Sequence, residues 1–124
     1  MKKFIVIGNP IEQSLSPQLH NYWIKNSYID AIYEKEKLNE DQLESIISQV
    51  RNKKISGINV TVPFKKTVIP YLDDLTAESK STQSVNTIYL KDNRIIGHNT
   101  DIFGFRTSIE KAGYNLNNKE VLIL

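Results

Sequence analysis

Cysteine is absent from the 124 residues, and histidine occurs only twice. Without cysteine the chain has no disulfide bond and no thiolate ligand for a metal ion. His20 and His98 lie far apart in the sequence, without the spacing that metal-binding histidines show. We therefore expect no bound metal.

Neither a long apolar run nor an excess of one charge sign is present. The longest apolar runs, Phe4 to Ile7 and Val121 to Leu124, are far shorter than the roughly 18 residues that a membrane span needs, and no signal peptide opens the chain. The 16 basic and 14 acidic residues are interspersed and leave a formal charge of +2, unlike the basic stripe of a nucleic-acid-binding protein. We expect a cytoplasmic protein that binds neither membranes nor nucleic acid.

Glycine-rich phosphate loops are missing as well. The chain has 5 glycines, and none belongs to a G-x-G-x-x-G or G-x-x-x-x-G-K-[ST] arrangement. The composition is otherwise that of an ordinary globular protein, with 40% apolar and 24% charged residues, and no repeat or low-complexity segment. The length suits one domain, since domains have about 100 to 150 residues.

Hydrophobic patterning predicts strands that alternate with helices. The clearest helix has an apolar stripe at i, i+3, i+4 and i+7, formed by Leu43, Ile46, Ile47 and Val50. The expected strands are 3–7, 31–38, 57–62, 87–91, 94–98 and 119–124, with a turn at 92–93, and the expected helices are 17–27, 40–53, 77–83 and 102–112. The expected N-caps are Ser16, Thr76 and Asp101, with a capping box at Asn39 and Gln42. This order predicts an α/β fold of three layers, a mixed, mostly parallel sheet with helices on both faces.

In sheets of this class, ligands bind beyond the carboxyl ends of the strands, so the candidate site residues are those that follow each strand. After the first strand come Ser14 and Ser16, beside a helix start whose free N–H groups suit an anion such as a carboxylate. Alternatively, Ser16 only caps the helix and Ser14 is solvated.

The third strand carries a second polar group. Asn59 and Thr61 are two residues apart and point to the same face, where an amide and a hydroxyl need polar partners. Lys65 follows just beyond the strand, at a place where a lysine near apolar walls can exchange a proton. The alternative for Lys65 is an ordinary solvated lysine.

A third polar group, around Asn86 and Asp101, flanks the last two strands of the expected domain. Taken singly, Asp101 is a helix cap, Asn86 a turn residue and Asn99 a solvated side chain. Their gathering after successive strands instead predicts a site for a small polyhydroxylated acid, in which Asp101 pairs with Lys65. We expect His20 to be a surface or boundary residue and Trp23 to serve the core.

Five motifs occur in order along the chain: Gly8-x-Pro10, Ser14-x-Ser16-Pro17-x-x-His20-Asn21, Gly57-x-Asn59-Val60-Thr61-x-Pro63-x-Lys65, Val85-Asn86-Thr87 and Gly97-x-Asn99-Thr100-Asp101-x-x-Gly104. With them, the chain resembles the N-terminal, substrate-binding domain of the shikimate dehydrogenase family from Phe4 to about Gly104. It departs from the usual family pattern at Gln83-Ser84, where Gly-Ala is common, and at Ile102, where Gly often stands. These departures concern loop shape and leave the reactive groups in place.

The resemblance implies that the full-length protein reduces 3-dehydroshikimate to shikimate, with NADP as cofactor, in aromatic amino acid biosynthesis. It implies that Ser14, Ser16 and Thr61 hold the ring carboxylate. Asn86 and Asp101 would hold the hydroxyls, and Lys65 with Asp101 would form the catalytic pair. Asn59 is a further candidate for substrate binding.

The resemblance also implies that the chain is part of a longer protein. We expect a substrate-binding domain at 1–104, a connecting helix and linker at 105–118, and at 119–124 the first strand of a dinucleotide-binding domain. NADP would then bind outside this chain, and the isolated piece would be inactive. Two alternatives stay open: a quinate/shikimate dehydrogenase, and a non-catalytic module that binds hydroxylated cyclic acids. The sequence leaves open whether the protein is a monomer or a homodimer.

Overall fold

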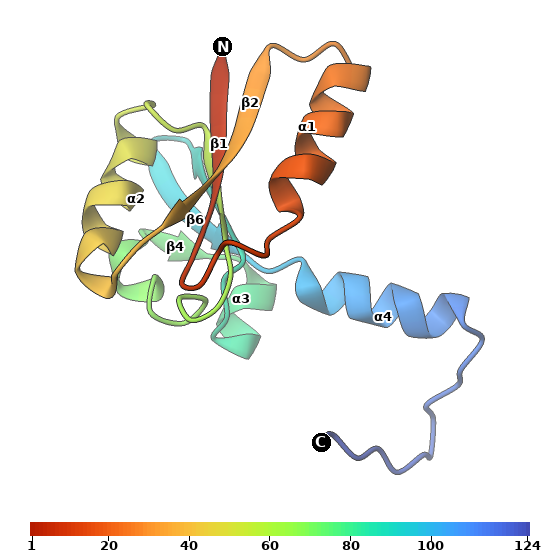
Figure 1. The fold of residues 1–124 in the computed structure, drawn as a ribbon. Coiled ribbons are helices and arrows are strands. Elements are labelled where there is room, and N and C mark those ends of the chain that lie inside the picture. The colour runs from red at the N-terminus through yellow and green to blue at the C-terminus, as the bar shows by residue number, and fades with distance from the viewer.

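Six strands form one sheet in the computed structural model, which describes residues 1–124 (Figure 1). The strands are β1 (Lys2–Gly8), β2 (Ala31–Lys37), β3 (Gly57–Val60), β4 (Asp74–Leu75), β5 (Thr87–Lys91) and β6 (Arg94–His98). Their order is β2-β1-β3-β5-β6-β4, and β5 alone runs antiparallel to its neighbours. The predicted mixed, mostly parallel sheet is therefore confirmed.

Helices cover both faces of this sheet, as predicted. The α-helices are α1 (Ser16–Asn26), α2 (Leu43–Arg51), α3 (Ala77–Thr82) and α4 (Asp101–Lys111), with short 3-10 helices at Glu40–Gln42 and Ile69–Tyr71. Figure 1 shows α1 and α2 on opposite sides of β1. It also shows α4 projecting away from the sheet, and no α4 residue is buried.

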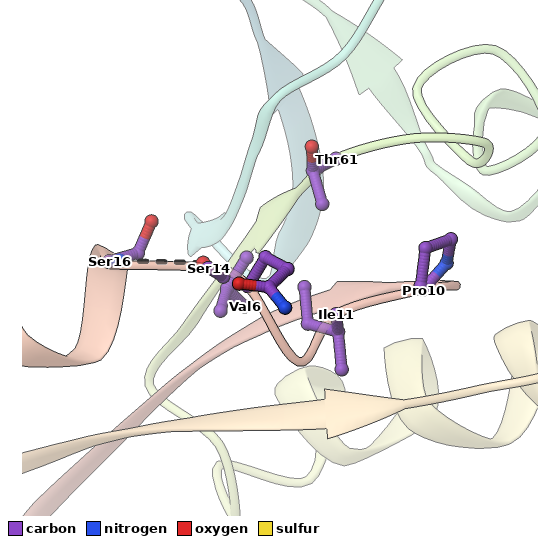
Figure 2. Close-up of a pocket in the computed structure, with 7 residues that line it drawn as sticks. Val6, Pro10, Ile11, Ser14, Ser16 and Thr61 are labelled. Atoms are coloured by element: carbon purple, nitrogen blue, oxygen red, sulfur yellow. Dashed lines mark hydrogen bonds between the residues drawn. The ribbon is translucent and has the colours of Figure 1, made fainter.

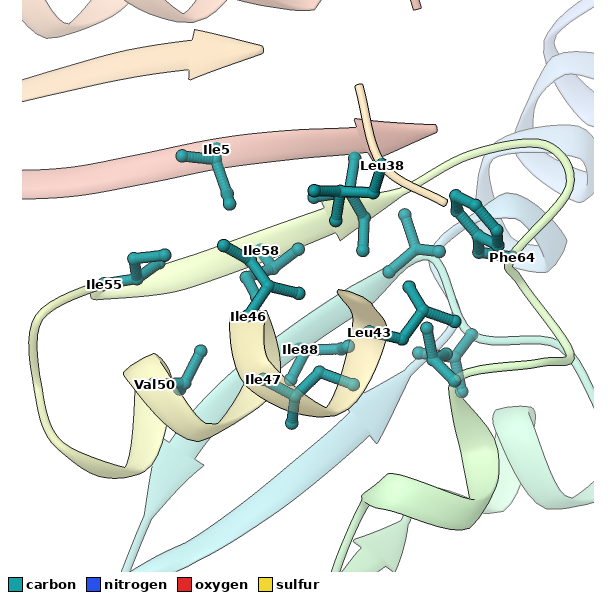
Figure 3. Close-up of a cluster of buried hydrophobic side chains, with 14 of the residues drawn as sticks. Ile5, Leu38, Leu43, Ile46, Ile47, Val50, Ile55, Ile58, Phe64 and Ile88 are labelled. Carbon is teal, nitrogen blue, oxygen red and sulfur yellow. The ribbon is translucent and has the colours of Figure 1, made fainter. Parts of the chain in front are cut away.

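The alternation of side chains along β1 explains why both faces need a helix. Ile5 and Ile7 point to one face, where they join the main core beneath α2 (Figure 3). Val6 points to the other face and packs with Ile11 and Tyr33 beneath α1. Fully burying one such aliphatic side chain contributes about 1.5–3 kcal/mol, so a strand that is apolar on both sides is stable only between two layers.

Two local predictions are confirmed in detail. The β5–β6 hairpin turns at Asp92 and Asn93. Both residues adopt positive φ, 49° and 60°, as the two central residues of a type I′ turn must. At the start of the 40–51 helical segment, the Asn39 N–H donates to Oε1 of Gln42 at 2.8 Å, which is one half of the predicted capping box.

Two of the three predicted helix caps are wrong. Ser16 and Asp101 are the first residues of α1 and α4 and not their caps. Thr76 does occupy the N-cap position of α3, although its side chain makes no capping hydrogen bond there. At α4 the N-cap position is Thr100, and the capping side chain is that of Asn99, whose Oδ1 accepts from the N–H groups of Asp101 at 2.8 Å and Ile102 at 3.2 Å. Residue type alone does not decide a cap, because the oxygen must also reach a free N–H group.

Residues 119–124, where the sequence predicts a strand, have no regular secondary structure here. A strand is defined by hydrogen bonds to a neighbouring strand, and this segment forms none with the sheet. Its assignment to a second domain therefore stays a prediction. None of the helices combines the length and the apolar character that crossing a membrane takes.

Replacement of Gly97 should test the packing of β6. A Cβ at Gly97 would lie 2.6 Å from Leu72 Cδ1 and 2.9 Å from Val85 Cγ2, so Gly97→Ala overpacks a buried site. We expect it to lower the free energy of unfolding by about 1–3 kcal/mol in urea denaturation. The control is Gly104→Ala, which meets nothing within 4 Å and replaces a helical glycine. This control should leave stability unchanged or raise it by up to about 1 kcal/mol, and equal losses in the two variants would contradict the packing argument.

Candidate functional site

The strand order brings the ends of four strands to one edge of the sheet. The chain passes from β1 to β2 on one side and then to β3 on the other, which makes the β1/β3 edge a topological switch point. β6 ends at the same edge because β5 is antiparallel to both β3 and β6, which makes β6 parallel to β3. Since β5 runs the other way, its first residues, and Asn86 before them, also lie there.

A cavity of about 210 Å³ opens at this switch point. Its lining includes Ser14, Ser16 and Thr61, the three hydroxyl residues that the sequence analysis singled out, together with Val6, Pro10, Ile11 and Gln13. Figure 2 shows Ser16 at the start of α1, Ser14 on the loop before it, and Thr61 on the segment after β3. The structure therefore brings these three hydroxyl groups together, around a space suited to a small anionic group.

Gly8 allows the end of β1 to lie close to the segment that carries Thr61. A Cβ on Gly8 would lie 2.6 Å from Cγ2 of Thr61 and 3.0 Å from the carbonyl oxygen of Val62. The two segments run this close because the Thr61 N–H donates to the Ile7 carbonyl at 3.0 Å and the Asn9 N–H to the Val62 carbonyl at 3.1 Å. Only glycine allows this contact without displacing Thr61.

Glu12 anchors the loop that carries Ser14, a role the sequence analysis missed. Its carboxylate accepts from Nζ of Lys37 at 2.9 Å and from the Ile11 N–H at 3.0 Å. Nζ of Lys35 donates to the Glu12 carbonyl at 2.7 Å. The hydrogen bond from Lys37, followed by those from backbone N–H groups, lowers the pKa of Glu12 to about 2. The loop is thus tied to β2 from both its side chain and its backbone.

Lys65 and Asp101 form the ion pair that the sequence predicts, with 2.7 Å between Nζ and Oδ2. Their side chains are 34% and 52% exposed, so both can reach a bound molecule. Nδ2 of Asn86 donates to the other carboxylate oxygen of Asp101 at 3.1 Å. Nδ2 of Asn86 also donates to Oγ1 of Thr100 at 2.7 Å, and Oδ1 of Asn86 accepts from the Thr100 N–H at 3.0 Å. Asn86 is therefore held in place and is more than a turn residue.

Lys65, Asn86 and Asp101 form a second group beside the hydroxyl-lined cavity, and none of the three lines it. Asn59 links this second group to Tyr33 on β2. Its Nδ2 donates to the Asn86 carbonyl and to Oγ1 of Thr87, both at 3.2 Å. Its Oδ1 accepts from the hydroxyl of Tyr33 at 2.6 Å. Asn59 is thus committed to protein partners on both sides of its amide.

Two further residues differ from expectation. Asn99, for which solvation was one interpretation, is only 3% exposed; it donates to the Ser84 carbonyl at 3.0 Å and caps α4. Trp23, expected in the core, is 51% exposed and touches His20 edge-on, which corrects that prediction. His20 is a boundary residue as expected, and burial lowers its pKa.

Comparison with known proteins gives a consistent result. Residues 6–88 match the family model described as the shikimate dehydrogenase substrate binding domain. A curated relative from Pelagibacter ubique, named shikimate dehydrogenase (NADP(+)), is 58% identical over 99% of this chain and 46% of its own length. A relative of the same name from Clostridium beijerinckii is 39% identical over 99% of this chain and 43% of its own length.

Solved structures agree with these matches. Shikimate 5-dehydrogenase from Thermus thermophilus in complex with shikimate superimposes with a TM-score of 0.86 at 29% identity, over 96% of this chain and 46% of that one. Shikimate dehydrogenase 1 from Peptoclostridium difficile also gives 0.86, at 31% identity, over 94% of this chain and 44% of that one. The chain thus spans a little under half the length of the relatives it matches.

Titration of Glu12 should test the anchored loop. Because Lys37 and two backbone N–H groups stabilise its carboxylate, ¹³C NMR should place the Glu12 midpoint near 2, well below the ordinary 4.5. The lowered pKa means that this carboxylate stabilises the fold above about pH 4.5 and loses that effect as the pH falls toward 2. Lys37→Ala should raise the midpoint, whereas Lys91→Ala, on the exposed end of β5, should not. A midpoint near 4.5 in the unaltered chain would refute the anchor.

Proposed function

The chain belongs to the shikimate dehydrogenase substrate-binding domain family, and on this basis we propose that it binds shikimate and 3-dehydroshikimate as part of a longer NADP-dependent shikimate dehydrogenase. The observation that carries the proposal is the hydroxyl-lined cavity with the Lys65–Asp101 ion pair beside it, at one edge of the sheet. Shikimate has a carboxylate at one end and hydroxyls around its ring, so its binding site needs donors for the carboxylate next to polar partners for the hydroxyls.

Each group has a distinct role in this proposal. The hydroxyls of Ser14, Ser16 and Thr61 bind the ring carboxylate, to which they and the nearby N–H groups donate. Asn86 and Asp101 bind ring hydroxyls, because a carboxylate accepts from a hydroxyl and an amide can also donate to one. A ligand without the matching hydroxyls would leave these polar groups unpaired, which is costly in a desolvated site.

Lys65 supplies the acid–base chemistry. When the ketone of 3-dehydroshikimate is reduced, its oxygen gains negative charge, and the ammonium group both stabilises that charge and donates a proton to the oxygen. In the opposite direction the neutral amine accepts the proton of the shikimate hydroxyl. Asp101 orients Nζ through the 2.7 Å ion pair. Such acid–base catalysis typically contributes about 10²- to 10⁴-fold to the rate.

The residues of this chain do not fit a dinucleotide. β1 leads into Gly8, Asn9 and Pro10, with no glycine-rich turn that opens directly into a helix. NADP is carried in the names of the relatives, and we assign its binding to the part of the longer protein outside these residues. We place the substrate-binding domain at 1–104, a connecting helix and linker at 105–118, and the start of the dinucleotide-binding domain at 119. We further propose that the longer protein is cytoplasmic and is a monomer or a homodimer.

Titration with shikimate tests the binding proposal directly. We expect amide NMR shifts confined to the segments around Ser14, Thr61, Lys65, Asn86 and Asp101. Ser14→Ala should weaken binding by about tenfold, because it removes a donor to the carboxylate. The matched control is Ser48→Ala on the exposed side of α2, which should not change affinity. Tighter binding of quinate would favour a quinate/shikimate dehydrogenase, and a folded chain without shifts at millimolar shikimate would contradict the proposal.

Lys65→Arg distinguishes a catalyst from a binding module. Arginine keeps the positive charge but does not give up its proton near neutral pH. In the full-length protein we therefore expect kcat to fall by about 100-fold or more, while shikimate affinity changes little. Lys66→Arg, at the neighbouring exposed position, is the control and should keep full activity. Unchanged turnover in Lys65→Arg would remove the proton-transfer role.

A further inference from the structure

Tyr33 lies behind the site and is assigned no role by the proposed function. It stands on β2, is only 4% exposed, and packs against Val6 and Ile11. Both of these residues line the hydroxyl-bearing cavity, whereas Tyr33 itself does not. The ring therefore supports the cavity wall from behind, without contact to its interior.

The His20-Asn21 pair of α1 fixes Tyr33 in place. The Tyr33 N–H donates to Oδ1 of Asn21 at 2.9 Å, and Nδ2 of Asn21 donates to the Tyr33 carbonyl at 2.7 Å. The His20 ring stacks on the Tyr33 ring with 4.2 Å between centroids and 3° between planes. The phenol is thus held relative to α1, the helix that begins at Ser16 of the cavity.

The hydrogen bonds around Asn59 leave only one orientation for its side-chain amide. A carbonyl oxygen can only accept, so Nδ2 must face the Asn86 carbonyl, 3.2 Å away. Oδ1 then faces Tyr33, whose hydroxyl must donate to it across 2.6 Å. Burial raises the pKa of Tyr33 to about 12, so the phenol keeps its proton near neutral pH.

From Asn59 the hydrogen bonds continue without a gap to the ion pair. Nδ2 of Asn59 donates to Oγ1 of Thr87, and that hydroxyl donates to Oδ1 of Asn86 at 3.0 Å. Nδ2 of Asn86 donates to Asp101, which holds Lys65. Loss of the phenol hydroxyl would leave Oδ1 of Asn59 without its donor and free the amide to rotate.

We propose that Tyr33 is a positioning residue for this site: its hydroxyl fixes the Asn59 amide, and through it Asn86 and Asp101, relative to the cavity that holds the substrate carboxylate. The inference rests on the proposed function for its ligand. It deepens that function by naming the residue that couples the carboxylate-binding group to the hydroxyl-binding group.

The test compares Tyr33→Phe with Tyr71→Phe in the 124-residue chain. Phenylalanine keeps the buried ring and its stacking on His20 and removes only the hydroxyl. Tyr71 is also partly buried, but it packs against the main core on the α2 side. In the ligand-free chain, we expect the side-chain amide NMR signals of Asn59 and Asn86 to move in Tyr33→Phe and to stay in place in Tyr71→Phe. A merely structural role would lower stability without moving these two signals.

Affinity is the second measurement. We expect Tyr33→Phe to weaken shikimate binding by about tenfold and Tyr71→Phe by less than about twofold. If Tyr33 acts through Asn59, adding Tyr33→Phe to Asn59→Ala should cause no further loss. Unmoved amide signals, or equal affinity in a chain that binds shikimate, would overturn the inference. If the unaltered chain binds no shikimate, the proposed function fails, and the amide signals alone then decide the inference.

Discussion

The parallel pairing of β1 with β3 is the contact on which the site depends. It continues beyond the strands, where the Thr61 N–H reaches the Ile7 carbonyl and Gly8 leaves room for the Thr61 side chain. Because the chain has already placed β2 on the other side of β1, the loop after β1 opens over this pairing. Ser14 and Ser16 on that loop and at the helix start then meet Thr61 across one cavity.

The requirement that buried polar groups be hydrogen-bonded shapes the rest of the site. Asn59 and Asn99 lie at or near the protein interior, and each uses both ends of its amide on protein partners. These bonds orient Asn86 and start α4 at Asp101, so the Lys65–Asp101 pair stands at a defined place beside the cavity. A site arranged in this way needs little reordering when a ligand binds, which preserves binding free energy.

Much of the fold could be predicted from local sequence patterns. The stripe of α2 and the turn at Asp92 and Asn93 were predictable because each depends on residues close in the chain. Helix caps were predicted less well. Ser16 has the right chemistry for a cap but is the first residue of α1, where its own N–H donates to Ser14. Local propensity states what a residue can do, and the path of the chain decides whether it does so.

The sequence by itself determined the fold class, the family and the polar residues that are candidates for the site, because short motifs and hydrophobic periods are local properties. Only the tertiary structure decided which side chains hold those residues: Tyr33 on Asn59, Lys37 on Glu12, and Asn99 between Ser84 and the start of α4. These partners are far apart in the chain, and no periodicity links them. They meet because strand order and strand direction bring distant segments to one edge of the sheet.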